Sequence, residues 1–118
     1  MNIDNEQLSQ WADMPSCAVT VCDTECRIIF MNKRSRDTFA DGTDRLIGRN
    51  LLDCHSPHSR AIIKQLLEEG GTNIYTIEKN GVRKMIYQSA WLTDSGDIGG
   101  LVELSMIIPD KMPHYVRK

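Results

Sequence analysis

The dipeptide Asn80-Gly81 stands between two runs of residues that favour β-strands, and it constrains the fold more than any other feature of the sequence. Asn-Gly is favoured in two-residue hairpin turns, whose central positions need positive φ. The flanking runs, residues 72–79 and 82–92, should therefore pair antiparallel. A second turn, Ser95-Gly96-Asp97, precedes a third β-rich run at 101–108. This part of the chain predicts three successive antiparallel strands.

Two further β-rich runs lie near the start of the chain, at residues 17–22 and 27–31. The short polar segment between them is typical of a hairpin turn, so these two runs should also pair antiparallel. Asn32 follows the second run and can cap a short helix over residues 33–39. The Asp41-Gly42 turn then ends that helix.

The strongest helix signal lies in the middle of the chain. Ser56-Pro57 is a typical start, because proline at the first helical position has no hydrogen bond to lose there. Gly70-Gly71 supplies the end. One broad apolar face between them is formed by Ile62, Ile63, Leu66 and Leu67.

A shorter amphipathic helix is predicted at the N-terminus, over residues 5–12. Asp4 can cap it, and its apolar stripe consists of Leu8, Trp11 and Ala12. Such a narrow stripe docks on a larger body and does not form a core by itself. The expected organisation is a capping helix at 1–13, one domain at 14–108 and a tail at 109–118.

Strands at both ends of the chain with helices between them predict an α+β fold, with the central helices packed on one face of the sheet. A length of 118 residues with 41% hydrophobic residues suits one globular domain. The net charge of −2 argues against a nucleic-acid partner. No apolar run approaches the ~20 residues that span a bilayer, so no membrane partner is expected. The N-terminus lacks a signal peptide, and a cytoplasmic location is expected.

The four cysteines are expected to be thiols, mostly buried. Cys22 and Cys26 flank the first hairpin turn, and the sequence does not decide whether these two are thiols or a disulfide. The spacing of Cys17, Cys22, Cys26 and Cys54-His55 matches no usual zinc pattern, so no metal site is expected.

Several segments, taken together in their order along the chain, resemble the PAS domain over residues 14–108. These are the hairpin ending in Ile29-Phe30-Met31-Asn32, the helix after it, the segment Leu46-Ile47-Gly48-Arg49-Asn50, and the closing strands with Gly96-Asp97-Ile98-Gly99-Gly100. Asn32 matches the asparagine that commonly ends the second PAS strand. The segment from Leu52 to His58 is similar to a subset of PAS domains with a Cys-His pair and a proline before the long helix.

The resemblance implies a PAS-like five-stranded antiparallel sheet and a sensory or regulatory module. We expect a concave site for a small ligand between the sheet and the helices. The alternative is that the same residues fill a core. The expected apolar lining consists of Phe30, Phe39, Ile62, Leu66, Tyr87 and Trp91, with Asn32, His55 and Gln88 as polar contacts.

The cofactor is unknown from the sequence. Some PAS domains bind haem through a histidine on the long helix, which makes His58 a weak candidate ligand. The family's iron-binding histidine normally lies deeper in that helix, where this chain has Ile62 or Ile63. A flavin photoreceptor would need a reactive cysteine in an Asn-Cys-Arg motif, which is absent. No nucleophile with an oxyanion device is visible, so an enzyme is not expected.

Two kinds of partner are expected. Leu8 and Trp11 of the N-terminal helix would form a homodimer contact if they are exposed. A signalling partner protein would receive the output. A pure dimerisation module with a filled core and a haem-based gas or redox sensor are the alternative functions.

Overall fold

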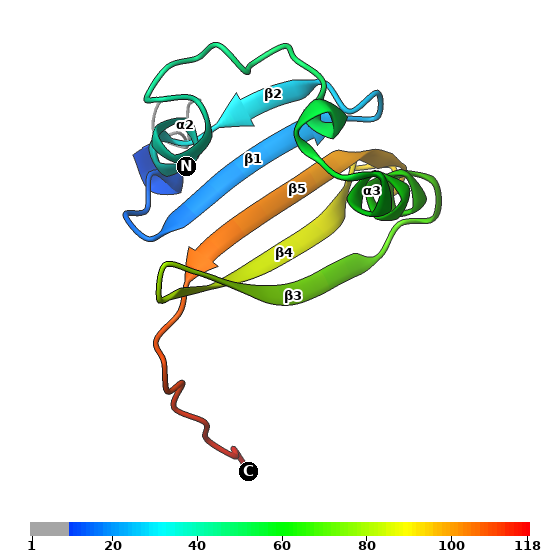
Figure 1. The fold of residues 1–118 in the computed structure, drawn as a ribbon. Helices are drawn as coiled ribbons and strands as arrows, with labels where there is room; N and C mark the ends of the chain where they lie inside the picture. The colour runs from blue at the N-terminus through cyan, green and yellow to red at the C-terminus, as the bar shows by residue number, and fades with distance from the viewer. Residues whose placement is uncertain (1–9) are drawn as a thin grey trace.

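The computed structural model describes residues 10–118 and contains one five-stranded antiparallel sheet with helices on one face (Figure 1). Its strand order is β2-β1-β5-β4-β3, so the two hairpins meet where β1 pairs with β5. The strands are β1 (Cys17–Asp23), β2 (Ile28–Met31), β3 (Thr72–Lys79), β4 (Val82–Leu92) and β5 (Ile98–Ile107). The helices are α2 (Lys33–Phe39), the 3-10 helix η1 (Leu51–Cys54) and α3 (Pro57–Glu69). This architecture confirms the predicted PAS-like α+β class.

Local signals at the helix ends act as predicted. The Asn32 side chain caps α2 by accepting a hydrogen bond from Ser35 N. Ser56 caps α3 in the same way through Ser59 N, with Pro57 in the first turn. At the other end of α3, Gly70 has a φ of 80°, and its N–H donates to Leu66 O.

The last strand begins earlier than predicted. It starts at Ile98 and not at residue 101, so Gly99 and Gly100 are part of β5. The pairing continues through this segment, with Trp91 opposite Gly100 and Leu92 opposite Ile98. Glycine in this strand marks a close approach and not a turn, because the Trp91 ring occupies the place where a side chain at position 99 would lie.

The first hairpin turns without glycine. Asp23 Oδ1 accepts hydrogen bonds from Glu25 N and Arg27 N, each at 2.9 Å, and Cys26 takes a left-handed φ of 63°. All four cysteines are free thiols, of which Cys54 alone is exposed. Burial raises the pKa of Cys22 to about 12, so its reactive thiolate is disfavoured.

The core lies between the sheet and α3. Cys22, Leu101 and Ile63 are fully buried there. Strand alternation makes Ile86, Gln88 and Ala90 of β4 share the helix-facing side with the core residues of β1 and β5, here called the inner face. Side chains at the alternate positions lie on the outer face.

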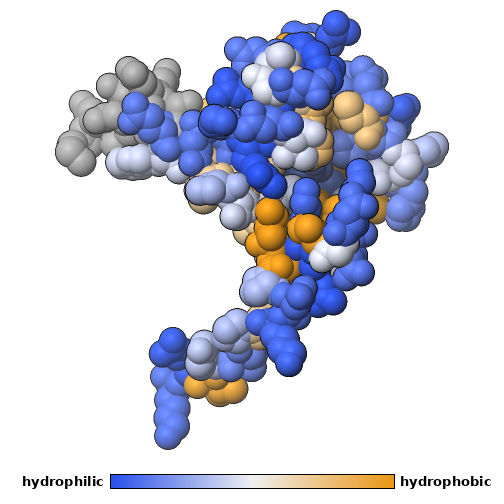
Figure 2. All heavy atoms as spheres, turned by 60° about the vertical axis from the view of Figure 1, so that its left-hand side comes forward, coloured by the Kyte–Doolittle hydropathy of each residue, from blue (hydrophilic) through white to orange (hydrophobic). Residues whose placement is uncertain are grey.

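Both ends of the described chain carry exposed apolar side chains. Leu8 and most of the predicted N-terminal helix lie outside the described residues, while residues 10–12 are helical and Trp11 is 61% exposed. After β5 the tail extends away from the sheet (Figure 1), and Figure 2 shows apolar side chains gathered where it leaves the body. Met112 and Val116 on the tail are exposed. Within residues 10–118, no helix has the length and hydropathy to cross a membrane.

Candidate functional site

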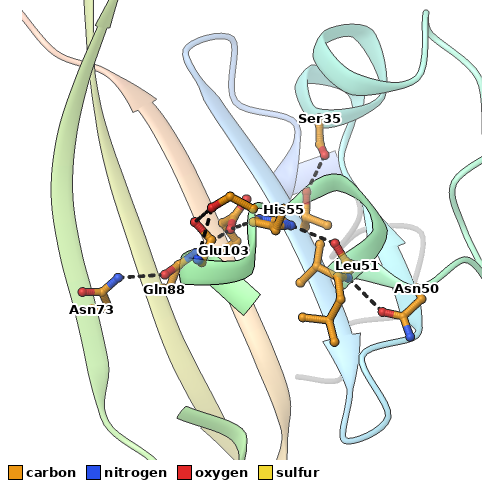
Figure 3. A network of polar contacts seen from close by, with 11 residues as sticks. Ser35, Asn50, Leu51, His55, Asn73, Gln88 and Glu103 are labelled. Carbon is orange, nitrogen blue, oxygen red and sulfur yellow. Dashed lines mark hydrogen bonds and ion pairs between the residues drawn. The ribbon is translucent and has the colours of Figure 1, made fainter. Parts of the chain in front are cut away.

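A row of polar side chains crosses the inner face of the sheet. The strand register aligns Asn73, Gln88, Glu103 and Thr20, one each from β3, β4, β5 and β1. Asn73 Nδ2 donates to Gln88 Oε1 at 3.0 Å, and Gln88 Nε2 donates to Glu103 Oε2 at 2.8 Å (Figure 3). Thr20 Oγ1 lies 2.6 Å from Ser35 Oγ of α2. The row therefore places a carboxylate in the middle of the sheet, held by hydrogen bonds.

His55 reaches this carboxylate from the helical layer (Figure 3). Asn50 caps η1 by accepting from Leu52 N at 2.8 Å, and His55 directly follows η1. His55 Nδ1 lies 2.8 Å from Leu51 O, and it must carry a proton because a carbonyl only accepts. His55 Nε2 lies 3.5 Å from Glu103 Oε2. The local turn therefore orients the imidazole toward the sheet.

The two groups favour each other's charged form. The hydrogen bond to Glu103 raises the pKa of His55 and outweighs burial, which lowers it. Burial raises the pKa of Glu103, but hydrogen bonds from His55 and Gln88 outweigh it, so the pKa is lowered overall. The His55 contribution to stability is complete below its ordinary pKa of 6.5 and is lost as pH rises through the raised pKa. The Glu103 contribution is present above 4.5 and is lost as pH falls through the lowered pKa.

Replacing His55 with glutamine should remove one component of the pH dependence of stability. The free energy of unfolding of the wild type is expected to fall, relative to His55→Gln, as pH rises from about 6 to about 9. Urea unfolding at several pH values measures this difference. The variant keeps the other two of the three histidines, so the difference reports His55 alone. Parallel curves for the two proteins would contradict the prediction.

A cavity of about 120 Å³ opens beside the His55–Glu103 pair. Its lining is mostly apolar, with a few polar groups at one end. Phe39, one of the lining residues, is 45% exposed. It is lined by Thr20, Ile28, Met31, Phe39, Leu46, Leu51, Cys54, His55 and Glu103.

A second hollow of about 270 Å³ lies between the start of α3 and strands β3 and β4. His58 lines this hollow and is exposed on the first turn of α3. A haem needs an apolar cavity large enough for its macrocycle and an axial ligand directed into it. His58 lies outside the main cavity, and that cavity has about the volume of a single ring, so these residues do not fit a haem. Within residues 10–118, no three His, Cys, Asp or Glu side chains form a group that could hold a metal ion.

The predicted ligand residues are divided among several places. Phe39 and His55 line the main cavity. Ile62 and Gln88 line the second hollow, and Leu66 is buried in the core. Their role in ligand binding stays a prediction.

Asn32 is a structural residue in this arrangement and does not line either hollow. It is 1% exposed, and its side chain accepts hydrogen bonds from Val19 N and Ser35 N. The same side chain donates to Ala12 O and Cys17 O. All four hydrogen bonds go to the backbone, so they hold the first strand, the start of α2 and the residues before the sheet together.

The placement of Phe30, Tyr87 and Trp91 in the cavity wall is wrong. Phe30 pairs with Val21 and Tyr87 with Leu104, which puts both on the outer face. Trp91 is four positions after Tyr87 on β4 and lies on the same outer face. Its ring covers Gly99, and its Nε1 donates to Cys22 O at 3.1 Å. The physical reason is the two-residue period of a strand, because a neighbour one position away faces the opposite side.

Sequence reasoning missed Glu103 as a site residue. It lies within a β-rich run, and nothing next to it in the sequence points to His55, which is far away along the chain. A signal was present, because an acidic residue is rare at the inner position of a central strand unless it is paired. The residues opposite it, Thr20 and Gln88, are polar as well.

Comparisons with known proteins agree on the fold. The PAS domain of the histidine kinase ThkA is 15% identical with a TM-score of 0.65, covering 77% of this chain and 98% of that one. A sensory box sensor histidine kinase from Vibrio cholerae is 15% identical with a TM-score of 0.63, covering 88% and 90%. VqmA, solved bound to DPO, is 15% identical with a TM-score of 0.67, covering 91% and 58%. No curated protein matches the chain.

The fold thus defines a PAS-type domain, and a sequence match to the family supports the same assignment. The chain matches the family described as PAS fold over residues 13–77, which is more than half of its length. The chain belongs to the PAS family, whose domains are in general sensory or regulatory and not catalytic. The narrower likeness of residues 52–58 to one subset of the family stays a prediction.

Proposed function

We propose that this chain is a sensory module that binds a small molecule in the cavity beside His55 and Glu103. The observation that supports this most is the combination of an apolar wall with a few convergent polar groups at one end, which is typical of small-molecule sites. The fold neighbour VqmA was solved with DPO, which agrees with a ligand-binding role. Occupancy of the cavity would change the packing of α2 and η1 and so the contacts offered to a partner protein.

The same geometry favours binding over catalysis. Cys54 and Thr20 also line the cavity, and a nucleophile there would need an adjacent base. Both nitrogens of His55 are engaged, one with Leu51 O and the other with Glu103. Thr20 Oγ1 is tied to Ser35 Oγ. His55 therefore has no free nitrogen with which to activate either group.

A fragment screen tests the proposal. Aromatic fragments of up to about ten non-hydrogen atoms, added to isotopically labelled protein, are expected to shift backbone amide signals around Phe39, Leu46 and His55. Leu46→Trp should abolish these shifts because the indole fills the cavity. Ile74→Trp is the matched control, because Ile74 is exposed on the outer face of β3. A screen without binders, or binding that Leu46→Trp leaves intact, would overturn the proposal.

A pure interaction module is the second candidate, supported by exposed apolar surface. Trp11 is exposed, and α2 and α3 both lie on the inner face of the sheet. Half-buried apolar side chains such as Val19, Val102 and Leu104 occupy the outer face. A large exposed apolar surface marks an interaction site.

Replacing Trp11 with glutamate tests this second candidate. If Trp11 contacts a second copy, the variant is expected to shift a dimer toward monomer, because a charge cannot be buried unpaired in an apolar interface. Sedimentation of wild type and variant measures the oligomeric state. The same substitution at exposed Leu92, the last residue of β4, is a control for added charge alone. Unchanged sedimentation of Trp11→Glu rejects this contact.

A further inference from the structure

We infer that the cavity beside Glu103 selects a small organic ammonium ion: a primary amine on an apolar body of about one ring. This inference rests on the proposed function, since it names the ligand class of the same cavity. It follows from three features of the site, which are a free carboxylate oxygen, the absence of a competing fixed cation in the lining, and the size of the cavity.

The first feature is the arrangement of the Glu103 carboxylate. Both of its side-chain contacts among the described residues run through Oε2, to Gln88 Nε2 at 2.8 Å and to His55 Nε2 at 3.5 Å. Within residues 10–118, every fully buried side-chain nitrogen or oxygen has a hydrogen-bond partner. Among these residues Oε1 has none, so it is not fully buried by them, and Glu103 lines the cavity. One oxygen of a well-held carboxylate is therefore available to a donor in the cavity.

The second feature is the set of charges around this oxygen. The lining contains no lysine or arginine, and His55 is its one basic residue. Arg60 of α3 is engaged elsewhere, because its Nε donates to the His55 carbonyl oxygen at 2.9 Å. From β3, burial and, to a smaller extent, the Glu103 charge raise the pKa of the Tyr75 hydroxyl, which keeps it neutral. A ligand cation would thus meet a carboxylate whose one cationic neighbour is able to lose its proton.

The third feature is the room available. A cavity of about 120 Å³ is close to the volume that accepts benzene in an engineered apolar core. Ile28, Met31 and Leu51 form the apolar wall for such a ring. The polar end, with Glu103 and Thr20, is where a single donor group would point.

Binding of an ammonium ion has a consequence for His55. With both an ammonium and a protonated imidazole beside one carboxylate, the site would hold an unbalanced positive charge at low dielectric. His55 keeps its Nδ1 proton on Leu51 O and can release the one on Nε2. Amine binding is therefore expected to tighten as pH rises from about 6 to about 8, over which an alkyl ammonium stays protonated. A neutral donor of the same shape lacks this dependence.

The test uses benzylamine, benzyl alcohol and toluene, which share one ring and differ in the donor group. Calorimetric titrations in phosphate buffer, free of other amines, are expected to rank benzylamine first. Glu103→Gln should weaken benzylamine binding about tenfold to a hundredfold, as expected for a hydrogen bond to a charged group, and should change benzyl alcohol binding little. Retained benzyl alcohol binding also shows that the variant is folded. Glu78→Gln, at an exposed position of β3, is the matched control and should leave all affinities unchanged.

Each outcome decides between the two proposals. If the three compounds bind equally well, or Glu103→Gln leaves benzylamine binding unchanged, the cavity binds ligands but the ammonium inference is wrong. If benzylamine binds best but without tightening between about pH 6 and about pH 8, proton release from His55 is wrong and with it the charge argument. If none of the three binds, the cavity is not a ligand site, and the proposed function fails as well.

Discussion

Replacing Asn32 with alanine is expected to lower the free energy of unfolding by about 3 kcal/mol or more. Asn32 makes four side-chain hydrogen bonds to the backbone and is 1% exposed. Loss of the α2 cap alone costs about 1 kcal/mol. Each buried backbone group left without a partner costs about 1–3 kcal/mol more. Because a domain is stable by only about 5–15 kcal/mol, this loss is a large fraction of the total.

Two variants separate burial from capping. Asn50→Ala is the matched control, because Asn50 also caps a helix but is exposed and makes one such hydrogen bond, to Leu52 N. It should cost about 1 kcal/mol or less. Asn32→Asp keeps the acceptor for Val19 N and Ser35 N, but it sets a buried carboxylate oxygen against Ala12 O and Cys17 O. It should therefore cost at least as much as Asn32→Ala, although the helix cap is kept. Urea unfolding measures all three. Equal losses for Asn32→Ala and Asn50→Ala would show that the buried network adds nothing.

Asn32 also illustrates what the sequence predicts well. Its role as a helix cap follows from residues next to it, as does the start of α3 at Ser56-Pro57. The hairpin at Asn80-Gly81 is local in the same sense, and Asn80 has the expected positive φ of 53°. The PAS class follows from the order of such elements. These features were predictable because the signal and the structure involve the same few residues.

The candidate site was harder to predict because it depends on contacts between distant residues. The sequence indicates His55 but not its partner Glu103, since only the pairing of β5 with β1 and β4 brings that carboxylate to the inner face. Tyr87 and Trp91 lie on the face opposite to the predicted one, because the composition of β4 does not say which alternate set of side chains is buried. Gln88, between them on β4, is on the inner face and is fully buried. Strand composition therefore predicts a strand far better than it predicts the face.

The second large effect concerns the point where β5 enters the sheet. Replacing Gly100 with alanine is expected to cost about 4 kcal/mol or more, which leaves the domain marginally stable or unfolded. A Cβ at Gly100 would lie 1.9 Å from Cys22 O and 2.7 Å from Trp91 Nε1. That carbonyl accepts the Trp91 indole N–H at 3.1 Å, so the added methyl group disrupts the hydrogen bond as well as the backbone. Overpacking costs about 1–3 kcal/mol and a buried unpaired donor about 1–3 kcal/mol.

Gly96→Ala makes the same chemical change without the collision. Gly96 has a positive φ of 86°, but a Cβ there would meet nothing within 4 Å. Only the backbone strain remains, at about 1 kcal/mol. Urea unfolding, with amide spectra to show whether a folded population exists, compares the two variants. If Gly100→Ala loses no more stability than Gly96→Ala, then β1 and β5 can separate at this point at little cost. The Trp91–Cys22 hydrogen bond would then add little to the β1–β5 pairing that joins the two hairpins.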